Sequence, residues 1–379
     1  MWVADEQQRA MLDTVRRLCD RDIRPYVQEM DEKAEFRREI FNRFGELGLT
    51  GILIPEEYGG LELGYSTSTL VLAEIASVSA AYAVSIMVHW LCAAAITTFG
   101  TEDQKQEYLP RLASGELMGA WSLTEPNAGS DAASLRTAAA HQDDGYILNG
   151  TKSFISNGGA ADVYVAFTRT SADRYSGITA FIIEKGWPGV SFGKKENKMG
   201  IRACDTRSMI FEDCYVPTSK RLHEEGQGFR VAMTMMDAGR INNAALTLGI
   251  AQGAMREAVK YAQEREQFGK KIGDFQGVQF MLADIKVGVE TTAAIVARAA
   301  YKKDHGLPVT ADASVAKMYS ADVAMRAAEN AVQIHGGYGY MKEYPVEQFF
   351  RDAKIFQITE GTNQIQRVII AKRMLQGEV

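Results

Sequence analysis

Hydrophobic residues recur at helical spacing near the start of the chain. Met11, Val15, Leu18 and Cys19 form one stripe, and residues 40–49 carry a second. Apolar positions three or four residues apart lie on one face of a helix. The pattern therefore predicts amphipathic helices that pack on a common core.

The helical pattern continues to about residue 118. Residues 54–60 form a turn-rich break, and helices are predicted over residues 66–78 and 81–99. Thr101 is followed by an acidic pair, which is typical of an N-cap and first turn, and it opens a further helix. Residues 1–118 are therefore a predicted α-helical domain.

Between residues 119 and 222 the helical period gives way to short runs rich in β-branched and aromatic residues. Strands are predicted over residues 146–150, 162–168, 178–183 and 207–217, and Asn149-Gly150 is interpreted as a turn. No helical repeat separates these strands. The segment therefore indicates a small antiparallel barrel or sandwich.

After residues 226–228 the helical period returns and holds to the end of the chain. Helices are predicted over residues 229–263, 277–305 and 311–334, followed by a final pair. The predicted fold class is α+β, mainly α. Its domains are a helical unit at 1–118, a β unit at 119–222 and a helical bundle at 223–379.

Composition narrows the functional classes. The hydrophobic fraction of 46% and the charged fraction of 24% are ordinary for a soluble globular protein. A formal charge of −6 argues against nucleic acid as a main partner. The four cysteines lack metal-ligand spacing, and their scatter favours a reduced, intracellular protein without a metal site.

The N-terminal segment carries no secretory signal pattern. Residues 1–24 mix acids and bases with apolar residues and contain no apolar h-region. The most apolar run, residues 80–96, is at the short limit for a membrane span and is interpreted as a buried helix. We expect a cytoplasmic location if the source is bacterial, the mitochondrial matrix if it is eukaryotic, and no stable membrane insertion.

Near the C-terminus a carboxylate stands on a short connection between two predicted helices. Glu360 is followed by Gly361, the residue type that most easily adopts a left-handed conformation. Asn363, with Gln366 three residues later, resembles a capping box for the last helix. A carboxylate fixed there with apolar neighbours could serve as a general base, although an exposed Glu at a helix end fits the local sequence as well.

Three longer motifs, in order along the chain, resemble signatures of the acyl-CoA dehydrogenase family. They are the Leu-Thr-Glu-Pro-Asn-Ala-Gly-Ser-Asp run at 123–131, the Arg-Glu-Gln-Phe-Gly-Lys run at 265–270, and the segment from Gln333 through Arg367. The resemblance extends from about residue 5 to about residue 375. It implies an N-terminal helical domain, a middle β-barrel domain and a C-terminal four-helix bundle.

The resemblance also implies bound FAD, held between the β domain, the bundle and a neighbouring subunit. No G-x-G-x-x-G pattern follows a predicted strand, so a Rossmann site is not expected. The matching β-domain residues are Trp121, Leu123, Thr124, Gly129, Ser130, Phe154 and Ser156. The matching residues of the bundle and its turns are Arg265, Gln267, Phe268, Gln276, Gln333, Gly336, Gly337, Thr362 and Gln364.

Substrate contacts follow from the same resemblance. Ser130, Asp237, Arg240 and Gly361 match positions beside the thioester and its CoA arm. Some branched-chain members carry their catalytic carboxylate at the position of Gly239, which has no side chain here. Glu360 is therefore the carboxylate that matches a family base position.

The implied reaction is α,β-dehydrogenation of an acyl-CoA. Glu360 would take the α-proton while hydride leaves Cβ for flavin N5, and the Glu360 backbone N–H would help hold the thioester carbonyl. An electron-transfer flavoprotein would reoxidise the flavin, and a homotetramer is expected. An acyl-CoA oxidase and a non-catalytic acyl-CoA-binding scaffold are the alternatives.

The acyl group is expected to be neutral and of short to medium length, or branched. The predicted helix over residues 81–99 contains no Lys or Arg, so a second substrate carboxylate there would be unpaired. Met87 and Trp90 on this helix could shorten the acyl pocket.

Overall fold

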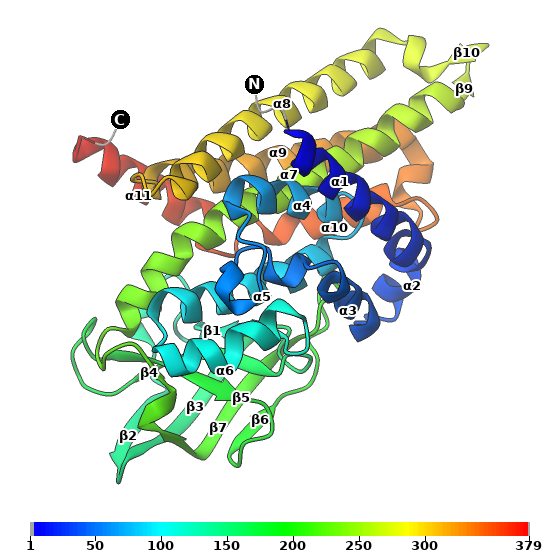
Figure 1. Cartoon of the computed structure of the whole chain (residues 1–379). Helices are drawn as coiled ribbons and strands as arrows, with labels where there is room; N and C mark the ends of the chain where they lie inside the picture. Colours follow the sequence, from blue (N-terminus) through cyan, green and yellow to red (C-terminus); the bar gives the residue numbers. More distant parts are fainter. Residues whose placement is uncertain (1–3, 378–379) are drawn as a thin grey trace.

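A computed structural model describes residues 4–377 and divides them between helices at both ends of the chain and strands in the middle. Figure 1 shows the sheet at one end of an elongated molecule and the long C-terminal helices extending away from it. The N-terminal helices are α1 (Glu6–Leu18), α2 (Val27–Glu32), α3 (Arg38–Glu46), α4 (Gly64–Ala76), α5 (Ala80–Phe99) and α6 (Glu102–Ala113), with a π-helical turn at Cys19–Ile23.

The start of α6 is the one predicted from its cap. Thr101 accepts the Gln104 backbone N–H, and the Gln104 side chain accepts the Thr101 N–H, so the two residues form a capping box. Asp5 and Gln8 form the same arrangement at α1. These side chains satisfy N–H groups that the first turn of a helix leaves free.

Helix α5 is the centre of the N-terminal core. Among the described helices it alone is long and apolar enough to span a membrane, yet 89% of its most apolar window is buried inside the protein. The prediction of a buried helix here is confirmed. Its large residues pack inward: Trp90 is buried and donates its indole N–H to the Leu49 carbonyl at 2.8 Å.

The sheet is mixed rather than purely antiparallel. Its strands run in the order β6-β7-β3-β2-β4-β5-β8, and β1 lies beside β4. Strand β4 pairs in parallel with β1 and, at one position, with β2; the other pairings are antiparallel. The strands are β1 (Gly119–Ser122), β2 (Ala138–Gln142), β3 (Gly145–Ser156), β4 (Val163–Arg169), β5 (Ile178–Glu184), β6 (Val190–Phe192), β7 (Thr206–Pro217) and β8 (Arg221–Leu222).

The prediction of a turn at Asn149-Gly150 is wrong. Both residues lie inside β3, where its register against β7 shifts in a bulge between Leu148 and Gly150. Gly150 has φ of 148°, and a Cβ there would meet Thr137 at 2.7 Å. The glycine therefore serves a close strand approach and a bulge, so β3 continues to Ser156.

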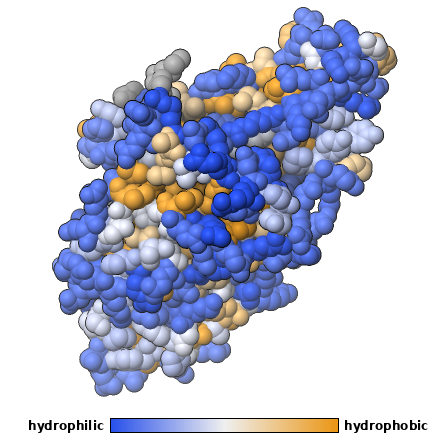
Figure 2. Space-filling model, turned by 45° about the vertical axis from the view of Figure 1, so that its right-hand side comes forward, coloured by the Kyte–Doolittle hydropathy of each residue, from blue (hydrophilic) through white to orange (hydrophobic). Residues whose placement is uncertain are grey.

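The C-terminal helices form the bundle. They are α7 (Gly228–Glu264), α8 (Gln276–Asp304), α9 (Thr310–His335), α10 (Val346–Ile355) and α11 (Asn363–Leu375). Between α7 and α8 a small hairpin, β9 (Glu266–Gln267) with β10 (Lys270–Lys271), projects at the end farthest from the sheet (Figure 1). Figure 2 shows a mainly hydrophilic face with a hydrophobic patch midway along the molecule and smaller ones towards its upper end.

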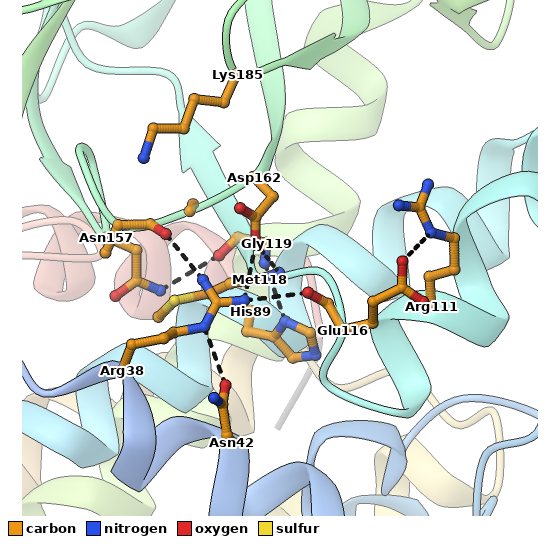
Figure 3. Close-up of polar contacts among 12 residues, drawn as sticks. Arg38, Asn42, His89, Arg111, Glu116, Met118, Gly119, Asn157, Asp162 and Lys185 are labelled. Atoms are coloured by element: carbon orange, nitrogen blue, oxygen red, sulfur yellow. Dashed lines mark hydrogen bonds and ion pairs between the residues drawn. The ribbon is translucent and has the colours of Figure 1, made fainter.

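A buried histidine joins the N-terminal helices to the sheet (Figure 3). The Gly119 N–H donates to His89 Nδ1 at 3.0 Å, so the ring proton lies on Nε2, which faces the Thr50 carbonyl at 3.3 Å. Asn157 donates to the Ser85 carbonyl at 2.8 Å from the same region. Burial lowers the pKa of His89 to about 4 and keeps the ring neutral.

An ion pair at the edge of this junction completes it. Arg38 on α3 donates to the Asp162 carboxylate at 2.9 Å and to the Ala160 carbonyl at 3.0 Å. Asp162 also accepts the Met118 backbone N–H at 2.8 Å. Helix α3 and the segments that lead into β1 and β4 are thus held together by hydrogen bonds to backbone groups as well as by packing.

Replacing His89 tests this junction. In H89L the Gly119 N–H and the Thr50 carbonyl lose their partner inside the core, so we expect a loss of about 2–3 kcal/mol in urea unfolding at pH 7.5. The unfolded chain protonates the histidine near pH 6.5 and the folded one only near pH 4, so its stabilisation is present above pH 6.5 and is lost as the pH falls through 4.

The difference in unfolding free energy between H89L and the wild type should therefore become smaller as the pH falls. H305L, in which an exposed histidine is lost at the end of α8, should stay within about 0.5 kcal/mol of the wild type. An H89L deficit that is constant from pH 7.5 to pH 4.5 would contradict a neutral buried ring.

Candidate active site

Glu360 stands on a backbone turn between α10 and α11. Its φ is 56° and that of Gly361 is 82°, so two successive residues adopt the left-handed region. A non-glycine residue there costs about 1 kcal/mol or more, and the surrounding contacts must hold it. The Gln366 amide donates to the Glu360 carbonyl at 3.1 Å and to the Gly361 carbonyl at 3.0 Å.

The predicted capping box at Asn363 is wrong by one residue. Thr362 is the N-cap of α11, and its hydroxyl accepts the Ile365 N–H at 3.2 Å. Asn363 is buried, and its amide instead donates to the Met318 carbonyl at 3.2 Å and to Asp322 at 2.8 Å. Tertiary partners on α9 therefore take the side chain that the local pattern assigned to the cap.

A cavity of about 560 Å³ opens beside the Glu360 turn. The end of α10 and strand β3 form two of its walls, and β3 contributes Phe154 and Ser156. Helix α5 contributes Val84, Met87 and Val88. Met87 therefore faces the cavity as the sequence suggested, whereas Trp90 does not.

The carboxylate of Glu360 is shielded. Its Oε2 atom is buried and has no hydrogen-bond partner among the described residues. A Cβ built on Gly239 would lie 2.6 Å from this oxygen, so α7 approaches the carboxylate as closely as a glycine permits. Burial raises the pKa of Glu360, while the nearby charges of Arg240 and Lys317 act in the opposite direction.

The backbone N–H of Glu360 also donates to no other described group. A shielded carboxylate and a free N–H on one residue can together bind a carbonyl compound and remove a proton beside its carbonyl. This pairing on a single fixed turn is the chemical core of the site.

A second cavity, of about 510 Å³, adjoins the helix that carries Gly239. Its lining includes Asp237, Arg240, Lys372 and Arg373, so its walls carry more cations than anions. Asp237 is already engaged: it accepts from Arg240 at 2.7 Å and from the Thr310 hydroxyl at 2.6 Å. The predicted substrate residues Arg240 and Gly361 thus lie near Glu360, and Asp237 orients Arg240.

Strand β1 and the loop that follows it carry the other predicted β-domain contacts. Trp121 packs on Phe167 with ring centroids 4.7 Å apart, and Leu123 and Thr124 are half-buried. Gly129 and Ser130 are exposed at the loop tip, and no atom lies within 4 Å of a Cβ built on Gly129. The backbone of this tip is therefore open to a ligand.

A buried ion pair fixes the base of that loop. Lys152 is fully buried and donates to the Glu125 carboxylate at 2.7 Å. Glu125 also accepts the backbone N–H groups of Arg136 and Thr137, at 2.6 and 2.9 Å. These charge-assisted bonds join β3 to both ends of the loop.

The remaining predicted cofactor residues lie elsewhere. Arg265 and Gln267 line a cavity with Gly336 and Gly337 at the far end of the bundle. Phe268, at the hairpin tip, is 93% exposed, and Gln276 and Gln333 are exposed near it. Arg265 is 25 residues beyond Arg240 in or at the end of α7, which is about 38 Å along the helix.

Phe154, Ser156 and Glu360 of one chain line the large cavity together, and neither Arg265 nor Phe268 of that chain is among its lining residues. Thr362 and Gln364 lie close to the Glu360 turn, where Gln364 lines a small cavity of about 240 Å³ with Arg367.

Sequence reasoning missed two parts of this site. The loop at residues 196–201 lines the large cavity, and α10 holds it: Arg351 donates to the Met199 carbonyl at 3.0 Å, and Asp352 accepts the Ile201 N–H. Lys317 on α9 lies fully buried beneath the Glu360 turn. Its signal was a lysine in the alanine-rich stretch 313–331, where a core-facing position is expected.

Comparisons with known proteins match the whole of this architecture. Three family models, acyl-CoA dehydrogenase N-terminal, middle and C-terminal domains, match residues 5–116, 120–214 and 226–375. An acyl-CoA dehydrogenase of Bacillus subtilis is 46% identical over 374 residues, 98% of this chain and 99% of the relative. The chain belongs to the acyl-CoA dehydrogenase family.

Two solved structures superpose closely. Butyryl-CoA dehydrogenase from Megasphaera elsdenii has a TM-score of 0.96 and 44% identity, covering 98% of this chain and 99% of its own. A structure described as an electron transferring flavoprotein of Acidaminococcus fermentans, in work on electron bifurcation, has a TM-score of 0.97 and 44% identity, covering 99% of each chain.

The protein is thus an FAD-dependent acyl-CoA dehydrogenase. The residues beside Glu360 fit a flat, partly polar ring system. Phe154 is 68% exposed on the cavity side of β3 with φ of 58°, and Ile358 is 52% exposed beside the turn. Large apolar side chains held out to solvent in a cavity are typical of a cofactor site.

The close approach of Gly239 to Glu360 can be tested. In G239A the new methyl group would push the carboxylate out of its place, so we expect flavin reduction by acyl-CoA to slow by about a hundredfold while FAD content stays normal. Anaerobic stopped-flow absorbance measures it.

G277A provides the matched control, because a Cβ on this glycine of α8 meets nothing within 4 Å. It should reduce flavin at the wild-type rate. A G239A enzyme that is equally fast would show that the carboxylate does not depend on this contact.

Proposed function

We propose that Glu360 is the α-proton base of the dehydrogenation and that its turn also binds the thioester carbonyl. The observation that carries this proposal is the buried, unpartnered Oε2 beside Gly239, on a residue whose own N–H is free. The thioester α-proton is weakly acidic, so negative charge must be stabilised on the carbonyl oxygen as the proton leaves. The Glu360 N–H is placed to donate to that oxygen.

FAD, when bound, accepts the hydride that leaves Cβ. We infer that Trp121, Thr124, Ser130, Phe154 and Ser156 hold it on one side, with Thr362 and Gln364 near the turn. Ser130 in the loop after β1, together with Arg240 and Gly361, would hold the thioester and its CoA arm. Binding of an acyl chain would exclude water from the cavity and raise the pKa of Glu360 further, towards the working pH.

Removing the carboxylate tests the base. E360Q should bind FAD and acyl-CoA normally and lose flavin reduction by at least about a hundredfold, the scale of a principal acid–base group. E343Q, which alters an exposed carboxylate in the same segment of the chain, should be unaffected. Near-normal reduction by E360Q would exclude Glu360 as the base.

The substrate we propose is a neutral acyl-CoA of short to medium chain length, straight or branched. The α5 wall of the cavity is Val84, Met87 and Val88, and the one histidine of α5 is neutral and turned to Gly119 and Thr50. The α5 wall therefore offers a second substrate carboxylate no cation. The Megasphaera relative, named for butyryl-CoA, supports a short chain.

A substrate panel tests the acyl preference. Butyryl-, isobutyryl- and octanoyl-CoA should bleach the flavin faster than palmitoyl- or glutaryl-CoA at equal concentration under anaerobic conditions. Glutaryl-CoA should be slowest because the α5 wall offers its second carboxylate no cation. If glutaryl- or palmitoyl-CoA were fastest, the proposed acyl preference would be wrong while the dehydrogenase activity stood.

We infer that FAD sites are completed between subunits of a homotetramer. The cavity at Arg265 lies about 38 Å along α7 from Arg240, which supports a role for this cavity and for the hairpin tip at Phe268 in a neighbouring chain's cofactor site. Large apolar side chains exposed on the hairpin and on α8 and α11 support contact with other copies. They are Phe268, Phe280, Val287, Val368 and Leu375.

Assembly and FAD retention should therefore fail together. F268A removes a side chain that contributes nothing to the core of one chain, yet it should release FAD and shift light scattering towards smaller species. L307A, which truncates another exposed residue, should do neither. An FAD-saturated monomer would contradict the proposal.

We infer that the electron acceptor is an electron-transfer flavoprotein and that the enzyme acts in a bacterial cytoplasm. The relationship to the Acidaminococcus structure supports the acceptor. An acyl-CoA oxidase would instead consume oxygen stoichiometrically with acyl-CoA, and a scaffold would bind acyl-CoA without bleaching the flavin. Oxygen consumption and anaerobic bleaching separate the three.

A further inference from the structure

Lys317 is a fully buried lysine on α9 directly below the Glu360 turn. Its ammonium donates to the Gly361 carbonyl at 2.7 Å and to the Asn363 side chain at 3.1 Å. Both acceptors belong to the connection that carries Glu360 into α11. The ammonium therefore holds the turn from the side opposite the solvent.

This burial is unusual because the hydrogen-bond partners of Lys317 are neutral. The other fully buried lysine among the described residues, Lys152, has the Glu125 carboxylate at 2.7 Å. Within residues 4–377, no carboxylate lies within ion-pair distance of Lys317. Burial lowers the pKa of Lys317 to about 8, and the field of Glu360 acts most strongly against that decrease.

Charged groups from α7, α9, α10 and α11 surround the turn. Helix α7 contributes Asp237 and Arg240, paired with each other at 2.7 Å. Helix α9 contributes Lys317 and Asp322, and Asp322 accepts from Gln357 and Asn363. Lys354 of α10 donates to Gln357, and α11 contributes Arg367, which lies 3.7 Å from Asp322, and Arg373.

Among these charged groups, Lys317 is the one that donates a hydrogen bond to the backbone of the turn, at the Gly361 carbonyl. Arg240 is paired with Asp237 and also acts on the Glu360 carboxylate through its charge, but it donates no hydrogen bond to the turn, and Arg367 and Lys354 bond to groups beside the turn. Lys317 can therefore contribute in two ways. Its hydrogen bonds fix the left-handed turn, and its charge compensates the carboxylate that Glu360 presents to the cavity.

We propose that Lys317 is a positioning residue for the base: it fixes the Glu360-Gly361 turn and stabilises the ionised carboxylate from inside the bundle. The proposal rests on the proposed role of Glu360. It assigns to α9 a part in catalysis without any contact to substrate.

The experiment compares K317M, K317Q and K302M with the wild type in the pH dependence of anaerobic flavin reduction by butyryl-CoA. K317M removes charge and donors, and K317Q removes the charge but keeps a donor for the Gly361 carbonyl. K302M removes a partly exposed lysine of α8 whose partner, Asp312, keeps Arg298. FAD content and thermal unfolding are recorded for each.

Without the ammonium, Glu360 ionises at higher pH, so the acid limb of the profile should move towards alkaline pH in both K317 variants. On that limb their rates should be about tenfold below the wild type, and K317Q should converge to within about twofold at alkaline pH. K302M should follow the wild-type profile. An equal loss for K317Q at every pH, with an unmoved limb, would overturn the proposal.

A second measurement needs no turnover. Because burial raises the pKa of Glu360, the ionised carboxylate costs stability, so E360Q should gain over the wild type as the pH rises above about 4.5. That gain should be larger when Lys317 is replaced, since the charge is then uncompensated. An equal gain in both backgrounds would overturn the charge effect even if K317M fails to bind FAD.

The two hypotheses fail separately. If E360Q reduces flavin normally, the assignment of the base is wrong. If E360Q is inactive and the K317 variants keep the wild-type limb, Glu360 stands and the role of Lys317 is wrong.

Discussion

The fold has to hold a carboxylate in a place where water does not solvate it. Glu360 Oε2 is buried without a hydrogen-bond partner in the part of the chain that the structure describes, and it is approached by the bare Cα of Gly239. Such an arrangement is unfavourable for the folded state, because an unpaired charge loses its hydration. It persists because contacts from two helices fix the strained turn: the Gln366 amide from α11 and the Lys317 ammonium from α9.

Several other elements form the walls of the large cavity beside that turn. The large cavity takes its walls from β3, from α5 and from the loop at 196–201, which α10 anchors through Arg351 and Asp352. Since α10 also leads into the Glu360 turn, the same helix positions Glu360 and the 196–201 wall of the cavity. The neutral His89 junction fixes α5 against β1, so the apolar wall and the sheet keep a constant relation.

The long helices, the cap of α6, the buried α5 and the order of α and β segments could be predicted from the sequence, because periodicity and capping are local signals. Strands β1, β2 and β6 were missed. They are short, and β2 begins with three alanines, which carry little β signal; they are strands because their neighbours supply hydrogen bonds. The predictions of a turn at Asn149-Gly150 and of a helix cap at Asn363 were wrong for the same reason, because tertiary contacts decided between local alternatives. Site residues came from motif resemblance, and Lys317 was missed because its importance depends on what lies across α9 from it.

Helix α7 has a further consequence for how this chain can change. It carries Gly239 against the Glu360 carboxylate, and it ends at Arg265, which lines the cavity at the far end. Deleting one residue between them would turn one site about 100° relative to the other and draw them about 1.5 Å together. The helix therefore fixes both the distance and the rotation between the Glu360 turn and the cavity at Arg265. Substitutions along its 37 residues can be tolerated one at a time, whereas insertions and deletions would be confined to the loops outside it.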